Sequence, residues 1–406
     1  MKPTKIDLNT ARKYIFQAQY LNNNQTQTKK AGILEIINQL GYIQIDTISV
    51  IQRAHHHTLW TRQDDYKPEI ISQLQTEEKA IFEYWGHAAS YLPIRDYRFY
   101  LPKMKNFADC RNKWIKDQTE KYKTYFDPLL EKIYLDGALT SRDIVCKSNE
   151  KRGGWWDWKP AKIALELLFW RGDLMISKRI NFQKYYDLTE RVLPKNIDLN
   201  YPSDHEVGVF CVKRALQAHA IASEKEICNN LNAAGKTTIK KALKFLLEEK
   251  QVIKIKIAEL PEIEYFAQSD LLNKHPQKSD QINILSPFDN LIIQRNRTRD
   301  LLGMNYSLEC YLPRNKRKFG YFTLPVFSGT KPLIKIDAKA DRKQKILVIK
   351  NMIREKQGLL NDDTIRRLSL KLLKFSFFNG CYGINIENSN PSDLKVKILT
   401  ALRKLS

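Results

Sequence analysis

The chain has 406 residues, of which 43% are hydrophobic, so it is long enough to form about three modules with their own cores. Its 68 lysines and arginines exceed its 45 aspartates and glutamates, which gives a formal net charge of +23. This charge is larger than solubility requires and indicates a polyanionic partner, for which nucleic acid is a better fit than a membrane surface. No apolar run approaches the length of a transmembrane span, so we expect no membrane association.

The N-terminal residues and the spacing of the cysteines both favour a cytoplasmic protein. Residues 1–16 mix charged and apolar side chains and lack the continuous apolar core of a signal peptide. The six cysteines show no Cys-x-x-Cys spacing, which argues against a zinc ribbon, an iron–sulfur cluster or a disulfide framework. We therefore expect a cytoplasmic protein with free thiols, no metal and no cofactor. A monomer is the default expectation because the predicted modules repeat within one chain.

The spacing of apolar residues predicts an α+β fold. Helical periodicity predicts helices over residues 8–21, 29–40, 69–75, 109–135, 161–171, 206–220, 223–231, 236–249 and 363–375. Period-two alternation and turn residues predict strands over 43–46, 173–188 and 252–266, and further strands between 306 and 349. Helices followed by a β element recur three times. This layout favours tandem winged-helix (helix-turn-helix) modules followed by a C-terminal β-rich domain.

The expected domain boundaries follow from the same pattern. Winged-helix module 1 covers 1–108, a helical connector 109–150, module 2 covers 151–204, module 3 covers 205–280, and the β-rich domain with its closing helix covers 281–406. The three modules are alike in layout rather than in sequence. A repeated architecture is therefore expected without a repeated motif.

Residues 40–48 form the first candidate site. Apolar and polar residues alternate within this segment, so a strand would place Gln44 and Asp46 side by side on one face. Such a pair can hold a water, with Asp46 accepting its proton and Gln44 orienting it. The alternative is a half-buried strand with a solvated polar face, because Gln-x-Asp recurs at 63–65 and 268–270.

Three consecutive histidines, His55, His56 and His57, follow this segment. In a strand only His55 and His57 would share a face, and no third ligand is apparent, so phosphate contact or a structural role is favoured over a metal site. Residues 235–237, Gly-Lys-Thr, end like a phosphate-binding loop but lack the glycine five residues earlier, so nucleotide binding is not expected.

Two further stretches are candidates for nucleic-acid contact. Trp155 and Trp156 could stack on bases and Lys159 and Lys162 could meet phosphates, although tryptophans before a helix also pack modules together. Residues 311–321 are predicted to form a β-hairpin, whose turn would carry a cationic tip able to probe a groove. The alternative for such a charge run is a solvated face. The cations at this tip are Arg314, Lys316, Arg317 and Lys318.

Six sequence blocks occur together and in order, which is far more specific than any one of them. They are Leu-Gly-Tyr-Ile-Gln-Ile-Asp-Thr-Ile (40–48), Arg-x-His-His-x-x-Leu-Trp-x-Arg (53–62), Phe-Glu-Tyr-Trp-Gly-His-x-Ala-Ser (82–90), Gly-Trp-Trp-x-Trp-Lys-Pro-Ala-Lys (154–162), Leu-x-Phe-Trp-x-Gly-Asp-Leu (167–174) and Ser-Pro-Phe-Asp (286–289). With these blocks the chain resembles, over nearly its whole length, the YcaQ type of winged-helix DNA glycosylases that unhook interstrand crosslinks.

This resemblance implies a monofunctional DNA glycosylase that hydrolyses the N-glycosidic bond of N7-alkylated guanine, unhooks N7-linked interstrand crosslinks and leaves an abasic site. Gln44 and Asp46 match the family's catalytic Gln-x-Asp pair, whereas the related azinomycin-crosslink glycosylases carry Gln-x-Gln. The implied partner is double-stranded DNA with alkylated or crosslinked guanine. The protein is accordingly expected in the cytoplasm, associated with the nucleoid. Within the matching blocks, the expected DNA contacts are Arg53, His55, His56, Arg62, Trp85 and His87.

The chemistry of the lesion agrees with a single carboxylate. N7 alkylation leaves the guanine cationic, so the base departs without a general acid while the sugar becomes oxocarbenium-like. No lysine stands within the motif, so Schiff-base chemistry and strand cleavage are not expected. The main alternative is a non-catalytic winged-helix transcriptional regulator, which would bind duplex DNA by sequence and be indifferent to Gln44 and Asp46.

Overall fold

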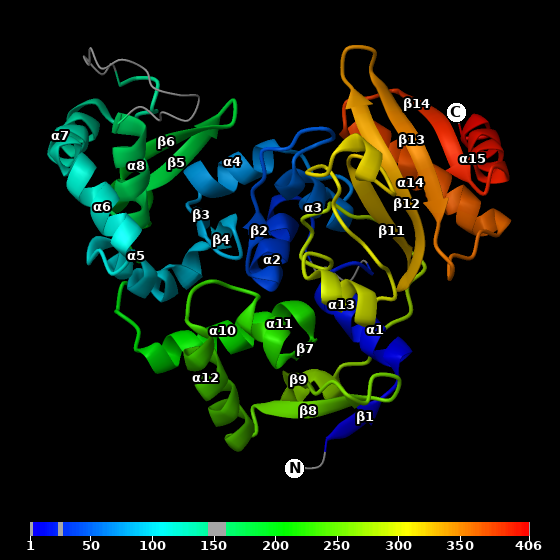
Figure 1. Ribbon diagram of the computed structural model, residues 1–406, viewed down its shortest axis with the longest axis horizontal. Coiled ribbons are helices and arrows are strands. Elements are labelled where there is room, and N and C mark those ends of the chain that lie inside the picture. The colour runs from blue at the N-terminus through cyan, green and yellow to red at the C-terminus, as the bar shows by residue number, and fades with distance from the viewer. Residues whose placement is uncertain (1–2, 23–26, 145–159, 406) are drawn as a thin grey trace.

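The structure is a computed structural model that describes residues 3–22, 27–144 and 160–405. Helices and strands are mixed along the chain in an α+β fold (Figure 1). The strands of the described residues form four separate sheets, each with its own set of helices. No helix in these ranges is long and apolar enough to cross a bilayer.

The first group of elements surrounds a three-stranded sheet. In the order β2 (Ile43–Gln44), β4 (Ala89–Pro93), β3 (Ile81–Trp85), its strands pair antiparallel. Asp7 caps the first helix by accepting a hydrogen bond from the Thr10 N–H at 2.9 Å. The second helix ends at Gly41, whose φ of +76° permits the turn that leads into β2. The helices are α1 (Leu8–Ala18), α2 (Lys29–Leu40), α3 (Ala54–Arg62) and α4 (Glu69–Thr76).

The second group ends in a two-stranded hairpin of β5 (Leu174–Ile180) and β6 (Gln183–Leu188). Its two turn residues, Asn181 and Phe182, have φ values of +48° and +66°. This left-handed conformation suits a hairpin turn and is common for Asn, but it is strained for an aromatic residue. The remaining elements are η1 (Ile94–Tyr100), α5 (Leu101–Ala108), α6 (Lys113–Tyr122), η2 (Lys123–Tyr125), α7 (Phe126–Asp136), α8 (Pro160–Arg171) and α9 (Thr189–Val192).

The third group packs α10 (Asp204–His219), α11 (Glu224–Cys228) and α12 (Lys236–Glu248) with a four-stranded sheet. Reciprocal capping boxes begin α10 and α11. The N-terminal strand belongs to this sheet, because β1 runs parallel to β8 at its edge. The strand order is β1 (Thr4–Ile6), β8 (Val252–Ile257), β9 (Tyr265–Gln268) and β7 (Ile221–Ser223), and η3 (Ser269–Asn273) follows β9.

The last group is built on a five-stranded sheet. Its first four strands pair antiparallel in chain order, and the fifth runs parallel to the fourth. The strands are β10 (Ile282–Ile284), β11 (Thr323–Ser328), β12 (Lys331–Asp341), β13 (Ile346–Arg354) and β14 (Gly383–Asn390). The accompanying helices are α13 (Arg295–Asp300), η4 (Arg314–Lys316), α14 (Asp362–Phe378) and α15 (Asp393–Arg403).

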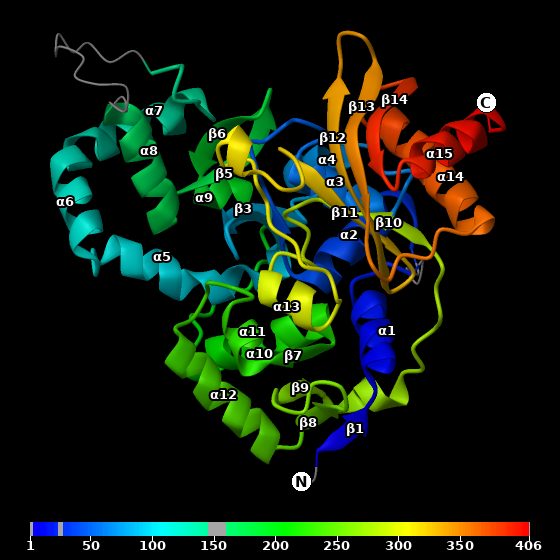
Figure 2. The same ribbon diagram turned by 45° about the vertical axis from the view of Figure 1, so that its right-hand side comes forward.

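Three hydrophobic cores join these groups to one another. The first core packs β3 and β4 with α5 to α8, the β5–β6 hairpin and α10 to α12. The second packs α2 and α3 against the five-stranded sheet and α14. The third packs α1 with β8 and β9, and in both views α1 lies between that sheet and β11 (Figure 1, Figure 2). Burial is therefore shared across the groups, and no group buries its apolar surface alone.

Three local expectations are wrong. Residues 54–62 form helix α3 rather than a strand, so the three histidines point around a helix and do not alternate across a sheet. Residues 303–322 form a long loop whose one short helical turn is η4, so the predicted cationic hairpin does not exist and the strand that follows the loop begins at Thr323. Helix α14 does not close the chain, because β14 and α15 follow it.

Candidate active site

Gln44 and Asp46 lie where β2 ends. The strand is held to β4 by pairing, and the Ile45 N–H donates to the Ala89 carbonyl at 2.8 Å just beyond it. Ile43 and Ile45 are buried, whereas Gln44 and Asp46 are partly exposed. The predicted alternation of faces is therefore confirmed, although the strand itself ends at Gln44.

The polar atoms of Gln44 and Asp46 differ in their hydrogen bonding. Asp46 Oδ1 accepts a hydrogen bond from the Ile48 N–H at 2.8 Å. Partial burial raises the pKa of Asp46, and this hydrogen bond opposes the shift. Gln44 Oε1 is buried and has no hydrogen-bond partner within the described part of the chain. A water that donates to both oxygens would satisfy the amide and place a proton next to its acceptor.

Cys310 and Tyr311, in the loop of residues 303–322, feel the charge of Asp46. Burial raises the pKa of the Cys310 thiol, and the negative charge of Asp46 raises it further. Burial and the Cys310 thiol raise the pKa of the Tyr311 hydroxyl, and Asp46 adds to that shift. Tyr311 is 76% exposed, so an aromatic ring stands in solvent near the candidate carboxylate. Tyr311 was not predicted as a site residue; its place just before the cationic segment was the available signal.

Two buried carboxylates fix the backbone of this loop. Glu309 accepts hydrogen bonds from three consecutive backbone N–H groups, those of residues 318–320, at 2.9, 2.8 and 3.3 Å. Asp337 accepts from the next two, residues 321–322, at 3.2 and 3.0 Å. Gly320 has a φ of +143°, and a Cβ there would lie 2.2 Å from Asp337 Oδ2, so the close approach requires glycine. The backbone at Lys318, the last cation of the loop, is thus fixed.

The cations of this loop differ in their surroundings. Arg314, Lys316 and Lys318 are exposed. Arg317 is half-buried; its Nε donates to the Leu312 carbonyl at 2.9 Å, and its guanidinium lies 4.8 Å from the centre of a tyrosine ring in the same loop. DNA contact by these four residues stays a prediction, and Arg317 also stabilises the loop.

The expected DNA contact of Arg62 is wrong. Its side chain is fully buried and forms two hydrogen bonds with the Asp289 carboxylate, at 2.7 and 3.0 Å. The Arg62 Nε also donates to the Gln19 carbonyl at 2.8 Å. This ion pair joins α3 to the segment that follows β10, so Arg62 holds the fold together and is not available to a phosphate.

The expected DNA contact of His55 is also wrong. Its side chain is 2% exposed and stacks on Phe182, with ring centres 6.0 Å apart. Burial, followed by neighbouring positive charges, lowers the pKa of His55 well below its ordinary value, so the ring stays neutral. His57, whose role the sequence left open, is buried against Phe375, and its Nε2 lies 3.0 Å from a backbone carbonyl oxygen of residue 284. Both histidines are core residues.

Four of the expected DNA contacts remain accessible. His56 is partly exposed, with its Nδ1 2.7 Å from the Tyr66 hydroxyl, and burial lowers its pKa to about 4. Arg53, Trp85 and His87 are partly exposed as well. DNA contact by all four stays a prediction.

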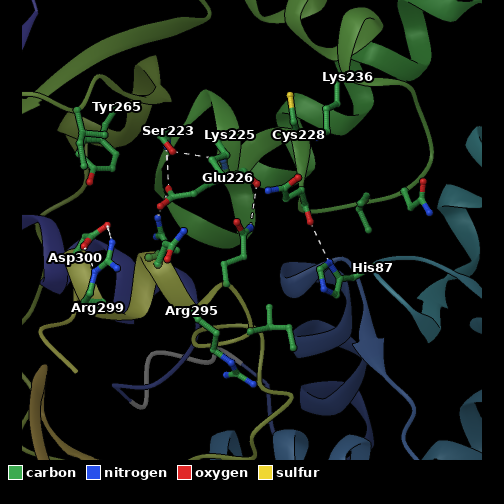
Figure 3. A pocket seen from close by; sticks show the side chains of 18 of the residues that line it. His87, Ser223, Lys225, Glu226, Cys228, Lys236, Tyr265, Arg295, Arg299 and Asp300 are labelled. Carbon is green, nitrogen blue, oxygen red and sulfur yellow. Dashed lines mark hydrogen bonds and ion pairs between the residues drawn. The ribbon is translucent and has the colours of Figure 1, made fainter. Parts of the chain in front are cut away.

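His87 lies in the wall of a cavity of about 960 Å³, which α11, α13 and the start of α12 also line (Figure 3). Its Nδ1 lies 3.0 Å from the Asn229 carbonyl, and its ring stacks on Tyr42, two residues before Gln44, at 5.9 Å. The other ionisable wall residues include Lys225, Glu226, Lys236, Arg295, Arg299 and Asp300. Because several carry positive charge, the cavity adds basic surface near β2.

Trp155, Trp156 and Lys159 lie outside the described residues. Lys162 is exposed in the first turn of α8, and its DNA contact stays a prediction. Within the described ranges, no three His, Cys, Asp or Glu side chains are grouped so that they could hold a metal ion.

A family model described as "DNA glycosylase AlkZ-like" matches residues 37–367, which include β2, α3 and most of the five-stranded sheet. The chain belongs to the AlkZ-like DNA glycosylase family. Among solved structures it is similar to the Streptomyces sahachiroi DNA glycosylase AlkZ, with a TM-score of 0.62 and 16% sequence identity over 94% of this chain and 100% of that one. The structural likeness shows a shared fold. The resemblance drawn from the sequence blocks is thereby confirmed for the superfamily.

Proposed function

We propose that this chain is a monofunctional DNA glycosylase that releases N7-alkylated guanine and unhooks N7-linked interstrand crosslinks. Family membership supplies the glycosylase class. The observation that carries the finer proposal is that Asp46, which is partly exposed, lies on the same face as Gln44, whose Oε1 has no hydrogen-bond partner among the residues that the structure describes. A carboxylate and an amide oxygen are the groups needed to position and deprotonate a water that attacks a sugar with a good leaving group.

In the proposed reaction, the oxygen of a water held by Gln44 and Asp46 bonds to the sugar C1′. The C1′–N9 bond breaks, and its electron pair moves into the guanine and neutralises the positive charge that N7 alkylation created. The water proton passes to Asp46. Ionised Asp46 also stabilises the oxocarbenium-like charge on the sugar. Because the cationic base leaves without a general acid, one carboxylate is sufficient.

The surroundings of Asp46 support action on bulky lesions. A base that is crosslinked to the other strand cannot swing freely into a deep pocket, so its glycosidic bond has to be reached from an open side. Asp46 is partly exposed, and the adjoining loop carries the exposed ring of Tyr311 together with exposed cations. An aromatic ring and positive charge suit a base and its flanking phosphates.

We further propose that the three helix-and-sheet groups are tandem winged-helix modules and that the five-stranded sheet with α14 and α15 is a C-terminal β domain. The proposed boundaries stay at residues 108, 150, 204 and 280, so η1 and α5 are counted with the first module, α6, η2 and α7 form the connector, and β1 is an addition to the third module. Each group combines a few helices with a small sheet, which supports this division.

The direct test is incubation of the protein with duplex DNA that carries N7-methylguanine, followed by measurement of released base and abasic sites. We expect base release, and strand breaks only after alkali treatment. A duplex joined by an N7-linked crosslink should yield separated strands. Absence of base release at excess protein, together with sequence-dependent binding of undamaged duplex, would instead favour the transcriptional regulator.

A further inference from the structure

Phe182, at the tip of the β5–β6 hairpin, is surrounded by cationic and aromatic side chains. The guanidinium carbon of Arg53 lies 4.1 Å from the centre of the Phe182 ring, and that of Arg179 lies 4.6 Å from it. His55 stacks on the same ring at an interplanar angle of 13°. Arg179 also donates to the Phe182 carbonyl at 2.9 Å, which holds the strained turn in place. The hairpin is thus fixed against the start of α3.

The charges of this cluster are not balanced. Arg179 is paired with Glu83 through two hydrogen bonds of 2.7 Å. Arg342 donates to two backbone carbonyls of residues 49–51, at 2.9 and 3.0 Å. Arg53 Nε is buried and has no hydrogen-bond partner in the described part of the chain. Burial, and then the positive charges of Arg342 and Arg179, lower the pKa of Arg53, which shows that the cations repel one another.

The helix that follows increases this positive potential. Arg53 is the residue directly before α3, and no side chain caps the helix at that position. The first N–H groups of a helix carry the positive end of its dipole, so a cation there is unfavourable and an anion is favourable. Arg53 therefore occupies a place that costs folding free energy unless an anion is bound.

A short segment of the chain connects this cluster to the candidate catalytic carboxylate of Asp46. Seven residues lead from Asp46 to Arg53, so the two lie at most about 25 Å apart. The hydrogen bonds of Arg342 to residues 49–51 hold this connecting segment. Because base pairs of a duplex rise by about 3.4 Å, DNA engaged at Asp46 reaches the cluster within about seven base pairs.

We propose that Arg53, Arg179 and Arg342 form a clamp for one backbone phosphate of the DNA near the damaged nucleotide. A phosphate would accept a hydrogen bond from the side chain of Arg53, which is partly exposed, separate the repelling cations and lie at the start of α3. The Phe182 ring lies against the guanidinium groups of Arg53 and Arg179. The planar fork of donors on arginine fits a phosphate better than the ammonium group of lysine does. This inference rests on the proposed function for its DNA partner, but its readout is binding rather than base release.

The test is a scan of backbone charge. A duplex carries a tetrahydrofuran abasic analogue in place of the damaged nucleotide, and single neutral methylphosphonates replace phosphates one at a time over about seven positions on either side, on each strand. The unmodified protein should lose affinity by about tenfold at one position, because a charge-assisted hydrogen bond is lost there. Arg53→Gln should bind the all-phosphate duplex about tenfold more weakly and show no further loss at that position.

The matched control is Arg366→Gln, which removes the same charge from α14, where Arg366 is 62% exposed and paired with Asp363. It should keep the position-dependent loss. Equal affinity of the unmodified protein for every methylphosphonate duplex overturns the inference and needs no variant. An Arg53→Gln protein that keeps the full loss overturns it too. If affinity is lost at one methylphosphonate position as expected but N7-methylguanine is not released, the clamp is supported and only the proposed function is rejected.

Discussion

Asp46 combines two demands that oppose each other. The reaction needs its ionised form, but partial burial disfavours that form and raises its pKa. A raised pKa means that the folded chain holds the proton more tightly than the unfolded chain does. Protonated Asp46 therefore contributes stability at low pH, and this contribution is lost as pH rises through the folded-state pKa. At neutral pH the ionised carboxylate lowers the free energy of unfolding, and it is retained because the reaction needs it.

Replacement of Asp46 by Asn should for this reason raise the unfolding temperature slightly at neutral pH. The amide is similar in shape and its oxygen can still accept from the Ile48 N–H. Thermal unfolding followed by circular dichroism measures the effect. At a pH below the ordinary range of aspartate the two proteins should unfold at nearly the same temperature. A clear loss of stability in the variant at neutral pH would show that the carboxylate supports the fold.

The pH dependence of base release should report the same group. Activity needs ionised Asp46, so the rate should fall as pH decreases through a pKa that lies above the ordinary aspartate value. Single-turnover rates on duplex with N7-methylguanine, corrected for spontaneous depurination, give the profile. An acidic limb that is unchanged in the Asp46→Asn protein would assign the titration to another group.

At the scale of elements, the loop of residues 303–322 joins a fixed backbone to exposed charge. Replacing Arg314, Lys316 and Lys318 together by Ala should weaken DNA binding by about tenfold or more and reduce its salt dependence, because up to three phosphate contacts are lost. The unfolding temperature should change little, since these side chains are exposed. Arg317 is left in place because it packs within the loop. Unchanged affinity would reject contact between this loop and DNA.

The elements also show what the sequence could and could not predict. Helix α10 was predicted within two residues at its start, because its apolar residues recur at helical spacing and this spacing is local. The loop around Tyr311 was misread as a hairpin, because its backbone N–H groups are satisfied by Glu309, a buried carboxylate whose acceptor role has no short-range pattern. Strand β1 was missed since three residues carry no period, and its partner β8 lies about 250 residues away.

The candidate site was predicted in part for the same reasons. Gln44 and Asp46 could be placed on one face, because alternation within a strand is local. The burial of Arg62 could not be predicted, because its partner Asp289 is far along the chain. Tyr311 and the clamp around Phe182 likewise depend on contacts between distant segments. Local pattern fixes faces of elements, and tertiary packing decides which of their polar side chains remain exposed.

On the scale of the whole molecule, the Arg62–Asp289 pair joins the first helices to the segment that leads into the C-terminal part. Asp289→Asn should lower the free energy of unfolding by about 3 kcal/mol or more, because it leaves Arg62 buried without its counter-charge. Urea unfolding measures this loss. The double variant Arg62→Met, Asp289→Leu should recover part of it, because no buried charge remains. A single variant as stable as the unmodified chain would show that the pair is dispensable.

Asp46 is the residue on which the proposed release of base depends most directly. Single-turnover incubation of the unmodified protein and of Asp46→Asn with duplex DNA that carries N7-methylguanine measures that role. We expect base release to fall by about 100-fold or more in the variant, while DNA affinity stays the same or rises slightly because one repulsion with phosphate is gone. Gln44→Ala should cost less, because a water can partly replace an amide that only orients another water. Release of N7-methylguanine by Asp46→Asn at the unmodified rate would contradict the catalytic assignment.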